Sequence, residues 1–327
     1  MTLETQFSIP AVHHVVYADD FCPFAHEIRD ELLRYPAWAE MTQDSRFDAV
    51  SQPRTDRQNG ITTRHIGEQQ RAMLPSALAF QDMLYQRAES LAARVGVDAA
   101  AGLEIEMNAM AYGEGAWLSP HSDYRPDDAR PRRVAWMLYL TNPEDGEWST
   151  EKGGAVRLFE KDVLAPLSAA HRSETRIRPR FNRFAMFQVS EGSLHEIEAI
   201  SWSCGWERCR MALSGWFRGP DTSGPMAARL YVRRPDADDI RAQREARLRG
   251  AIAMYRLLRL QQAHAGNDSG SLDDVLKRYE AEREAQSTAP AGTVFLRHAP
   301  GPAWCVVVID ETEKVVYLGP RDGYRGG

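Results

Sequence analysis

Cysteine is scarce in this sequence, and its distribution excludes two classes of site. The four cysteines are Cys22, Cys204, Cys209 and Cys305, and no two of them form a Cys-x-x-Cys pair. This scatter argues against a disulfide scaffold and against a structural zinc site. A metal is therefore expected on nitrogen and oxygen ligands, which favour iron, manganese or a catalytic zinc over an iron–sulfur cluster.

An excess of positive charge and long apolar runs are also missing. The formal net charge is −6, which gives no electrostatic reason to expect nucleic acid or an anionic membrane as a partner. No apolar run approaches the roughly 18 residues of a membrane span, and the first residues lack the basic start and apolar core of a signal peptide. Because 43% of the residues are hydrophobic, the chain can build a sizeable core, and we expect a cytoplasmic protein.

The N-terminal part, residues 1–100, has the periodicity of helices. The stretch VVYADDFCPFAHEIRDELLRY predicts a short strand and then a helix, with Asp20 as the helix cap and Pro23 in the first turn. A second helix is predicted from about Ser76 to Val95. These helices are expected to support the part of the chain that follows.

A β-rich region begins at Leu103. LEIEMNAMAYG alternates apolar and polar residues, and RRVAWMLYLTN, GGAVRLFEKD, RFAMFQVS and CRMALSGWFRG follow it, separated by turns or loops. Several short strands at this spacing predict an antiparallel sandwich or barrel. Helices followed by a β-rich core indicate an α+β protein, with one domain at 1–220 whose β core occupies 101–220.

Residues 221–327 are expected to form a C-terminal extension. The sequence predicts a long helix in ADDIRAQREARLRGAIAMYRLLRLQQAHA, a second helix in SLDDVLKRYEAEREAQ, and a hairpin within TVFLRHAPGPAWCVVVIDETEKVVYLG. Acidic residues lie close to its arginines, so these indicate a solvated helix face rather than a nucleic-acid patch. We interpret the extension as structural or as the interface of a homodimer.

The letters HSD contain the first candidate for a metal site. In an extended chain His121 and Asp123 point the same way, so they can offer an imidazole and a carboxylate to one point. A non-haem iron site needs a second histidine, and His195 follows a later predicted strand. Alone, the first two residues suggest a surface ion pair more readily than a metal site. His195 alone suggests a structural histidine, and its neighbours Glu196 and Glu198 are alternative carboxylate ligands.

A second candidate is the arginine in CRMALSGWF. Iron enzymes of this kind commonly use 2-oxoglutarate, whose far carboxylate needs a cation in a dry pocket. Arg210 suits that role because a guanidinium grips a carboxylate through two hydrogen bonds and stays charged when buried. It shares a strand face with Ala212, Ser214 and Trp216.

Taken in order, HSD, WMLYLTN, GGAVRLF, RFNRFAMFQVSEGSLHEI and CRMALSGWF resemble the prolyl-4-hydroxylase-type branch of the iron(II)/2-oxoglutarate dioxygenases. The resemblance covers about Leu103 to Arg218. It implies a double-stranded β-helix, or jelly roll, with flanking N-terminal helices. It also implies a dioxygenase that needs Fe²⁺, 2-oxoglutarate and O₂, with ascorbate as a stimulant.

The resemblance assigns roles residue by residue. The implied iron ligands are His121, Asp123 and His195. The implied co-substrate residues are Arg210 and Tyr139, on the far carboxylate of 2-oxoglutarate, and Tyr112, near the iron. Gly153, Gly154, Asn182 and Arg183 match structural positions of the family.

The resemblance implies hydroxylation of an unactivated C–H bond. Related halogenases have glycine or alanine in place of Asp123, so a carboxylate there favours hydroxylation, although desaturation and cyclisation start from the same chemistry. Candidate residues of the substrate pocket are Trp117, Trp202, Trp216, Arg125 and the loop Arg54–Arg64.

Three hypotheses for the function remain open. The first is an oxygenase acting on an amino acid or an amino-acid-derived small metabolite. The second is a hydroxylase acting on a residue of a protein partner, proline above all. The third is a metal-binding jelly roll that serves as a sensor without catalysis, against which the pairing of Tyr139 with Arg210 speaks.

Overall fold

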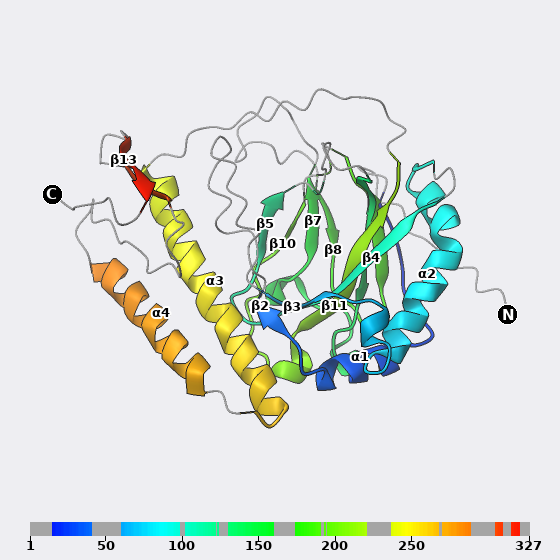
Figure 1. Ribbon diagram of the computed structural model, residues 1–327, viewed down its shortest axis with the longest axis horizontal. Helices are drawn as coiled ribbons and strands as arrows, with labels where there is room; N and C mark the ends of the chain where they lie inside the picture. Colours follow the sequence, from blue (N-terminus) through cyan, green and yellow to red (C-terminus); the bar gives the residue numbers. More distant parts are fainter. Residues whose placement is uncertain are drawn as a thin grey trace.

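Two antiparallel sheets form the centre of the computed structural model (Figure 1). The larger sheet contains, in spatial order, β1 (Val15–Ala18), β9 (Phe184–Gln188), β6 (Arg132–Tyr139), β11 (Arg210–Arg218), β4 (Glu104–Tyr112), β3 (Ile61–His65) and β2 (Ala39–Glu40). The smaller sheet contains β5 (Leu118–His121), β10 (His195–Ile197), β7 (Val156–Phe159) and β8 (Glu174–Ile177). The structure describes residues 15–40, 60–98, 102–121, 123, 130–159, 174–190, 193, 195–220, 237–267, 270–288, 305–309 and 315–320.

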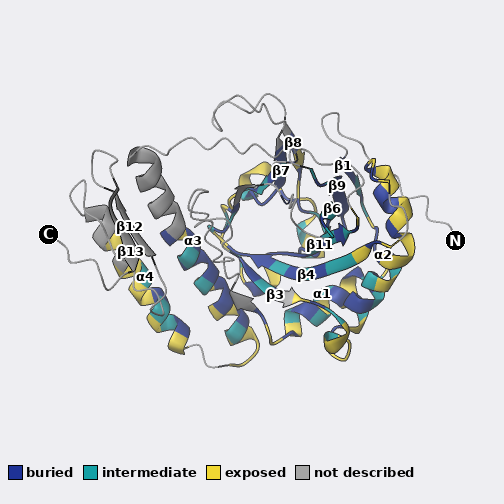
Figure 2. Cartoon of the chain, turned by 45° about the horizontal axis from the view of Figure 1, so that its top comes forward, coloured by how far each residue is buried: buried dark blue, intermediate teal, exposed yellow. Residues whose placement is uncertain are grey.

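From β4 onward the chain passes back and forth between the two sheets. β4, β6, β9 and β11 belong to the larger sheet, whereas β5, β7, β8 and β10 belong to the smaller one. Figure 2 shows the strands of both sheets arranged around a common centre. This mixed α/β architecture with antiparallel sheets confirms the predicted α+β class and is consistent with a jelly roll.

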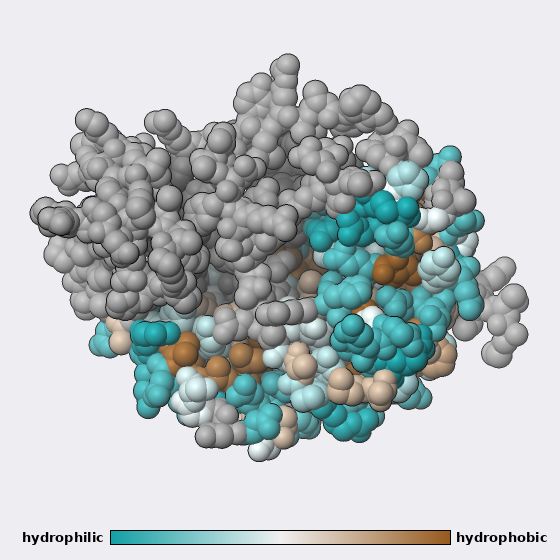
Figure 3. Space-filling view, viewed as in Figure 1, coloured by the Kyte–Doolittle hydropathy of each residue, from teal (hydrophilic) through white to brown (hydrophobic). Residues whose placement is uncertain are grey.

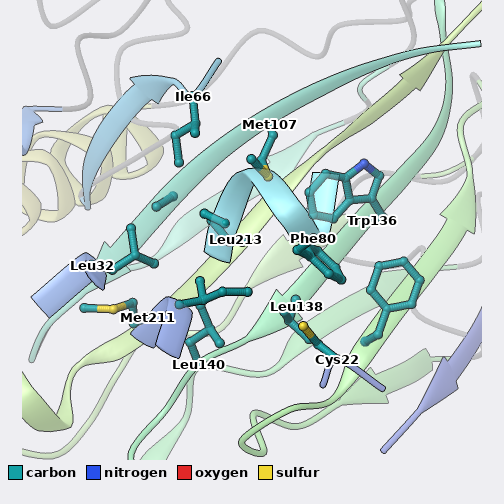
Figure 4. Close-up of a cluster of buried hydrophobic side chains, with 14 of the residues drawn as sticks. Cys22, Leu32, Ile66, Phe80, Met107, Trp136, Leu138, Leu140, Met211 and Leu213 are labelled. Atoms are coloured by element: carbon teal, nitrogen blue, oxygen red, sulfur yellow. The ribbon is translucent and has the colours of Figure 1, made fainter. Parts of the chain in front are cut away.

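The larger sheet is apolar on both faces because successive residues of a strand point to opposite sides. Its outer face packs against α1 (Ala25–Arg34) and α2 (Pro75–Arg94), and Leu213, Trp136 and Phe80 belong to this buried cluster (Figure 4). The inner face carries the alternate residues and forms a second cluster with the smaller sheet. The inner cluster is where the candidate site lies.

Helices α1 and α2 lie in the N-terminal part of the chain, and the start of α1 differs from the sequence prediction. Asp20 does not cap α1: the helix begins at Ala25 after Phe24, and Asp20 has a φ of 53°. Pro23 accordingly precedes the first turn. The reason is tertiary, because the side-chain amide of Asn182 accepts from the Cys22 N–H at 2.8 Å and donates to the Cys22 carbonyl at 3.0 Å. These bonds hold the chain in a loop up to the helix.

The C-terminal residues contribute two helices and a strand pair. These are α3 (Ala237–His264), α4 (Gly270–Thr288) and the antiparallel strands β12 (Cys305–Ile309) and β13 (Val315–Pro320). Short 3₁₀ helices lie at Glu68–Gln70, Pro143–Asp145, Thr150–Lys152 and Trp206–Arg208.

Helix α3 packs directly on the sheets. Leu257 belongs to the outer cluster and Ala253 to the inner cluster. A Cβ at Gly113, just after β4, would lie 3.3 Å from the Leu257 side chain. The predicted domain boundary at residue 220 stays a prediction, and so does the homodimer.

The described surface in Figure 3 is mostly hydrophilic with small hydrophobic patches. Within the described ranges, no helix combines the length and the apolarity that a membrane crossing requires.

Gly215, at the centre of β11, is held by close contacts on two sides. A Cβ there would lie 1.7 Å from the carbonyl oxygen of Glu106 and 2.9 Å from the Trp136 ring. We expect Gly215→Ala to lower the free energy of unfolding by about 2–3 kcal/mol, because a packed core cannot take up the methyl group. Urea denaturation measures the change.

The matched control is Gly205→Ala, where a Cβ would meet no atom within 4 Å and φ is −72°. It should change the unfolding free energy by less than about 0.5 kcal/mol. Equal stability of the two variants would contradict the contact at Gly215.

Candidate functional site

The candidate site begins where β5 and β10 pair in the smaller sheet. His121 and His195 are direct partners in this antiparallel pair, and Asp123 lies two residues beyond His121. The carboxylate oxygen Oδ2 of Asp123 lies 3.5 Å from Nε2 of His195, and both residues are buried. The structure therefore places the backbones of the three predicted ligands close together. For two of them, Asp123 and His195, the side-chain atoms also lie close together. The His121 side chain lies outside the described atoms.

The protonation of His195 is constrained by its other ring nitrogen. Nδ1 lies 3.0 Å from the carbonyl oxygen of Ser193, which can only accept a hydrogen bond, so Nδ1 carries a proton. In neutral His195 the Nε2 lone pair then faces the Asp123 carboxylate. A nitrogen lone pair and a carboxylate oxygen that face each other in this way can both bind one metal cation. This arrangement fits a metal held by nitrogen and oxygen.

Two further side chains fix the Asp123 carboxylate. The indole N–H of Trp216 donates to Oδ2 at 2.9 Å, and Nη1 of Arg132 lies 3.3 Å from Oδ1. The Arg132 guanidinium also stacks on the Trp216 ring at 3.5 Å. Trp216, predicted as a wall of the substrate pocket, thus contacts a predicted metal ligand. Bonds of this kind orient the ligands of a metal and tune its affinity.

Arg210 is a buried cation whose charge no described residue balances. It is 2% exposed, its Nε donates to the Gly154 carbonyl at 2.6 Å, and no described carboxylate forms an ion pair with it. Arg183, also buried, is by contrast paired with Asp19 and Glu147 at 2.6 Å each. A buried charge without a partner is costly. The contrast separates Arg183, whose charge is balanced by two carboxylates, from Arg210, whose charge is balanced by no described residue.

The two predicted tyrosines flank Arg210. Its guanidinium carbon lies 5.3 Å from the Tyr112 ring centre and 4.9 Å from that of Tyr139. Burial raises the pKa of Tyr112 to about 12. Burial also raises the pKa of Tyr139, against the lowering effect of the charge and hydrogen bond of Arg210. Both phenols are therefore neutral, and that of Tyr139 donates to the Ile177 carbonyl at 3.2 Å.

The paired glycines serve the backbone around Arg210, as predicted. Gly153 and Gly154 have φ values of +70° and +76°, which favour glycine. A Cβ on Gly153 would lie 1.9 Å from the Ala199 carbonyl, and one on Gly154 would lie 3.2 Å from Cδ of Arg210. The glycines thus let the strand approach the arginine closely enough to accept its Nε–H.

The Asp123–His195 pair and the Arg210 guanidinium lie at different positions along the inner cluster between the two sheets. Leu158 of β7 is the register partner of His195, and the carbonyl that binds Arg210 belongs to Gly154, four residues earlier. Arg210 and the Asp123–His195 pair are thus separated along the chain segment that runs into β7.

Trp202, another predicted pocket residue, lies on the Arg210 side of the interior. Trp202 packs edge-on against Trp148 at 5.4 Å, and Trp148 lies beside Gly154, so this pair is at the Arg210 level. Trp117 belongs to neither buried cluster. Arg125 and most of the loop 54–64 lie outside the described residues.

Sequence reasoning did not find Arg132 or the carbonyl of Ser193. Arg132 stands in a run of arginines near the start of β6 with no motif around it. Only the strand register shows that it stacks on Trp216 and reaches Asp123. The role of Ser193 is carried by a backbone atom, so its side chain gives no signal.

The comparison with known families agrees with this geometry. Residues 107–218 match the model of the 2OG-Fe(II) oxygenase superfamily, which confirms the resemblance seen in the sequence for this part of the chain. The family implies Fe²⁺, 2-oxoglutarate and O₂ as the cofactor and co-substrates, as predicted.

Curated relatives match a similar segment. The chain is 32% identical over 120 residues to prolyl 3-hydroxylase sudestada1 of Drosophila melanogaster, across 36% of this chain and 20% of that protein. It is 31% identical over 121 residues to prolyl 3-hydroxylase OGFOD1 of Xenopus laevis, across 37% and 21%. The matched segment therefore spans about a fifth of the length of these relatives.

Among solved structures, a Pseudomonas putida prolyl-4-hydroxylase is similar with a TM-score of 0.42 and 22% identity, over 63% of this chain and 93% of that one. A prolyl hydroxylase from Trichoplax adhaerens, solved in complex with a peptide of hypoxia inducible factor, has a TM-score of 0.44 and 16% identity, over 63% and 83%.

The contact between Trp216 and Asp123 leads to a test by metal binding. We expect Trp216→Phe to weaken the affinity for Mn²⁺ about tenfold, because the carboxylate loses a hydrogen bond that orients it. Calorimetric titration without oxygen measures the affinity.

Trp38→Phe is the control, because it removes an indole bond of similar length, from Nε1 to the Leu32 carbonyl, on the helix side of the larger sheet. Its Mn²⁺ affinity should equal that of the unmodified protein. The same affinity in both variants would argue against a supporting role of Trp216.

Proposed function

We propose that this protein is an iron(II)- and 2-oxoglutarate-dependent dioxygenase that hydroxylates a prolyl residue of a protein. The observation that carries the proposal is the uncompensated charge of buried Arg210 in the same interior as the Asp123–His195 pair. One end of this interior fits a metal and the other fits a carboxylate. The match of residues 107–218 to the oxygenase superfamily supports this pairing of ligands.

The proposal gives each residue a task. His121, Asp123 and His195 would hold iron(II), which supplies the activation of O₂ coupled to the oxidative decarboxylation of 2-oxoglutarate. Arg210 would bind the far carboxylate of the co-substrate. Tyr139 holds the guanidinium through its hydrogen bond, so it helps to orient Arg210.

The surroundings of the proposed metal keep the reaction dry. Phe187 packs edge-on against the His195 ring at 4.8 Å, and the inner cluster surrounds Tyr112 and Tyr139 with aliphatic side chains. Low water content strengthens the attraction between Arg210 and a carboxylate. It also protects a strong oxidant from side reactions.

The strand order also supports the proposal that the fold is a jelly roll. The alternation of β4 to β11 between the sheets is that of an eight-stranded jelly roll. We take this as the double-stranded β-helix, with α1 and α2 as supporting helices and α3 and α4 as the C-terminal extension. A sensor without catalysis is disfavoured, because burial of the Arg210 charge without a described carboxylate partner costs free energy and such a sensor needs no dicarboxylate to offset it.

The comparison with relatives changes the preferred substrate class. The sequence alone favoured an amino acid or a small metabolite. Two relatives with 32% and 31% identity are named prolyl 3-hydroxylases, which favours the alternative of a prolyl residue in a protein partner. The arginines that suggested a small metabolite from the sequence have side chains outside the described residues, so the metabolite is kept only as an outcome of the substrate test.

Arg210→Ala tests the assignment of the co-substrate. We expect the affinity for 2-oxoglutarate to fall about a hundredfold or more, because a buried charge pair loses one partner, while Mn²⁺ binding stays unchanged. Titration of the metal-loaded variant with 2-oxoglutarate measures both affinities.

The control is Arg176→Ala, which removes a partly exposed ion pair with Glu198 and should leave both affinities intact. Undiminished binding of 2-oxoglutarate to Arg210→Ala would reject the assignment.

The substrate class is tested by succinate formation with iron(II), 2-oxoglutarate and O₂. We expect proline-containing peptides to stimulate succinate release and to gain one oxygen atom on proline, detected by mass spectrometry, whereas free amino acids should not stimulate. Stimulation by free amino acids alone would favour the metabolite. An absence of turnover under all conditions, coupled or uncoupled, would sink the enzyme assignment.

A further inference from the structure

Ser214 is a polar residue beside the inner cluster that the proposed function leaves unexplained. Its hydroxyl oxygen is buried, and it has no hydrogen-bond partner among the described residues. The strand alternation places it on the inner face of β11, between Ala212 and Trp216, which both belong to or contact the inner cluster. A buried hydroxyl without a partner is costly, so this one calls for a ligand.

A second polar side chain lies directly opposite. Asn108 of β4 is the register partner of Ser214 in the antiparallel pair, and such partners have Cβ atoms about 5 Å apart on one face. Asn108 is half-buried. Its neighbours in alternation, Met110 and Tyr112, point toward the inner cluster. Ser214 and Asn108 thus form a polar pair on an otherwise apolar stretch of the wall.

The inner face has four levels along the β11–β4 pair. In order they are Arg210 with Tyr112, Ala212 with Met110, Ser214 with Asn108, and Trp216 with Glu106. The first level is cationic, the second is apolar and the third offers hydrogen-bond donors. At the fourth, Trp216 binds Asp123.

This order matches the chemistry of 2-oxoglutarate. Its far carboxylate suits Arg210, and its two methylene groups suit the apolar level of Ala212 and Met110. The 2-oxo acid head, which carries acceptor oxygens only, suits the hydroxyl of Ser214 and the amide of Asn108, because both can donate. The head then lies next to the level at which Asp123 stands.

We propose that Ser214 and Asn108 bind the 2-oxo acid head of 2-oxoglutarate and fix its orientation at the metal. This inference rests on the proposed function, because it needs that co-substrate. It adds two binding residues on the larger sheet to the ligands on the smaller one. The head group would then be held from both sheets at once.

The test measures 2-oxoglutarate binding to the Mn²⁺-loaded protein by calorimetry without oxygen, so that no turnover is needed. Ser214→Ala and Asn108→Ala should each weaken binding about tenfold, the loss expected for one hydrogen bond to a charged group. Asn108→Asp should weaken it further than Asn108→Ala, because it places a negative charge against an anionic head. Mn²⁺ affinity and the unfolding free energy of each variant are measured alongside.

The control is Ser201→Ala, which removes a hydroxyl from an exposed loop residue and should leave binding unchanged. If Ser214→Ala, Asn108→Ala and Asn108→Asp all bind 2-oxoglutarate as the unmodified protein does, the inference is overturned while the proposed function stands. Equal losses in Asn108→Ala and Asn108→Asp, together with weaker Mn²⁺ binding, would also overturn it, since they indicate a structural role. If the unmodified protein binds neither Mn²⁺ nor 2-oxoglutarate, the proposed function itself fails.

Discussion

The pairing of β11 with β4 and β6 is the constraint on which the rest of the structure depends. β11 lies between these two strands in the larger sheet. Its successive residues point alternately into the outer and the inner cluster. Leu213 packs toward the helices, whereas Arg210 and Trp216 point toward the smaller sheet. The register also explains the small residue at the centre, because the β4 carbonyl and the Trp136 ring leave no room for a methyl group at Gly215. A shift of one residue would exchange the two faces and remove the site.

Two charged groups on the inner side of the sheets define what the site can hold. Asp123 lies 3.5 Å from an imidazole nitrogen of His195, whose ring is oriented by a backbone carbonyl, and Arg132 and Trp216 hold its carboxylate in place. Arg210 is buried with no described carboxylate beside it. The first arrangement offers oxygen and nitrogen to a metal, and the second offers a cation to a carboxylate.

The sequence predicted the strands of the candidate site, but only part of the contacts around its residues. The candidates His121, Asp123, His195 and Arg210 were proposed because their order along the chain resembles a known family, and the alternating pattern predicted the strands that carry them. The packing of α3 against the sheets could not be predicted from the sequence, since an apolar stripe on a helix does not indicate which element it packs against. The stacking of Arg132 on Trp216 depends on strand register, and the missing cap at Asp20 depends on Asn182, far along the sequence. Long-range contacts of this kind leave no local pattern.

The central claim is that one interior holds a metal at Asp123 and His195 and a dicarboxylate at Arg210. The most direct measurement is a crystal structure of the protein grown without oxygen with Mn²⁺ and 2-oxoglutarate, with anomalous scattering used to locate the metal. The account predicts a manganese peak bonded to His121, Asp123 and His195, with the far carboxylate of 2-oxoglutarate on the Arg210 guanidinium. A metal bound elsewhere, or a carboxylate that leaves Arg210 without a partner, would contradict it.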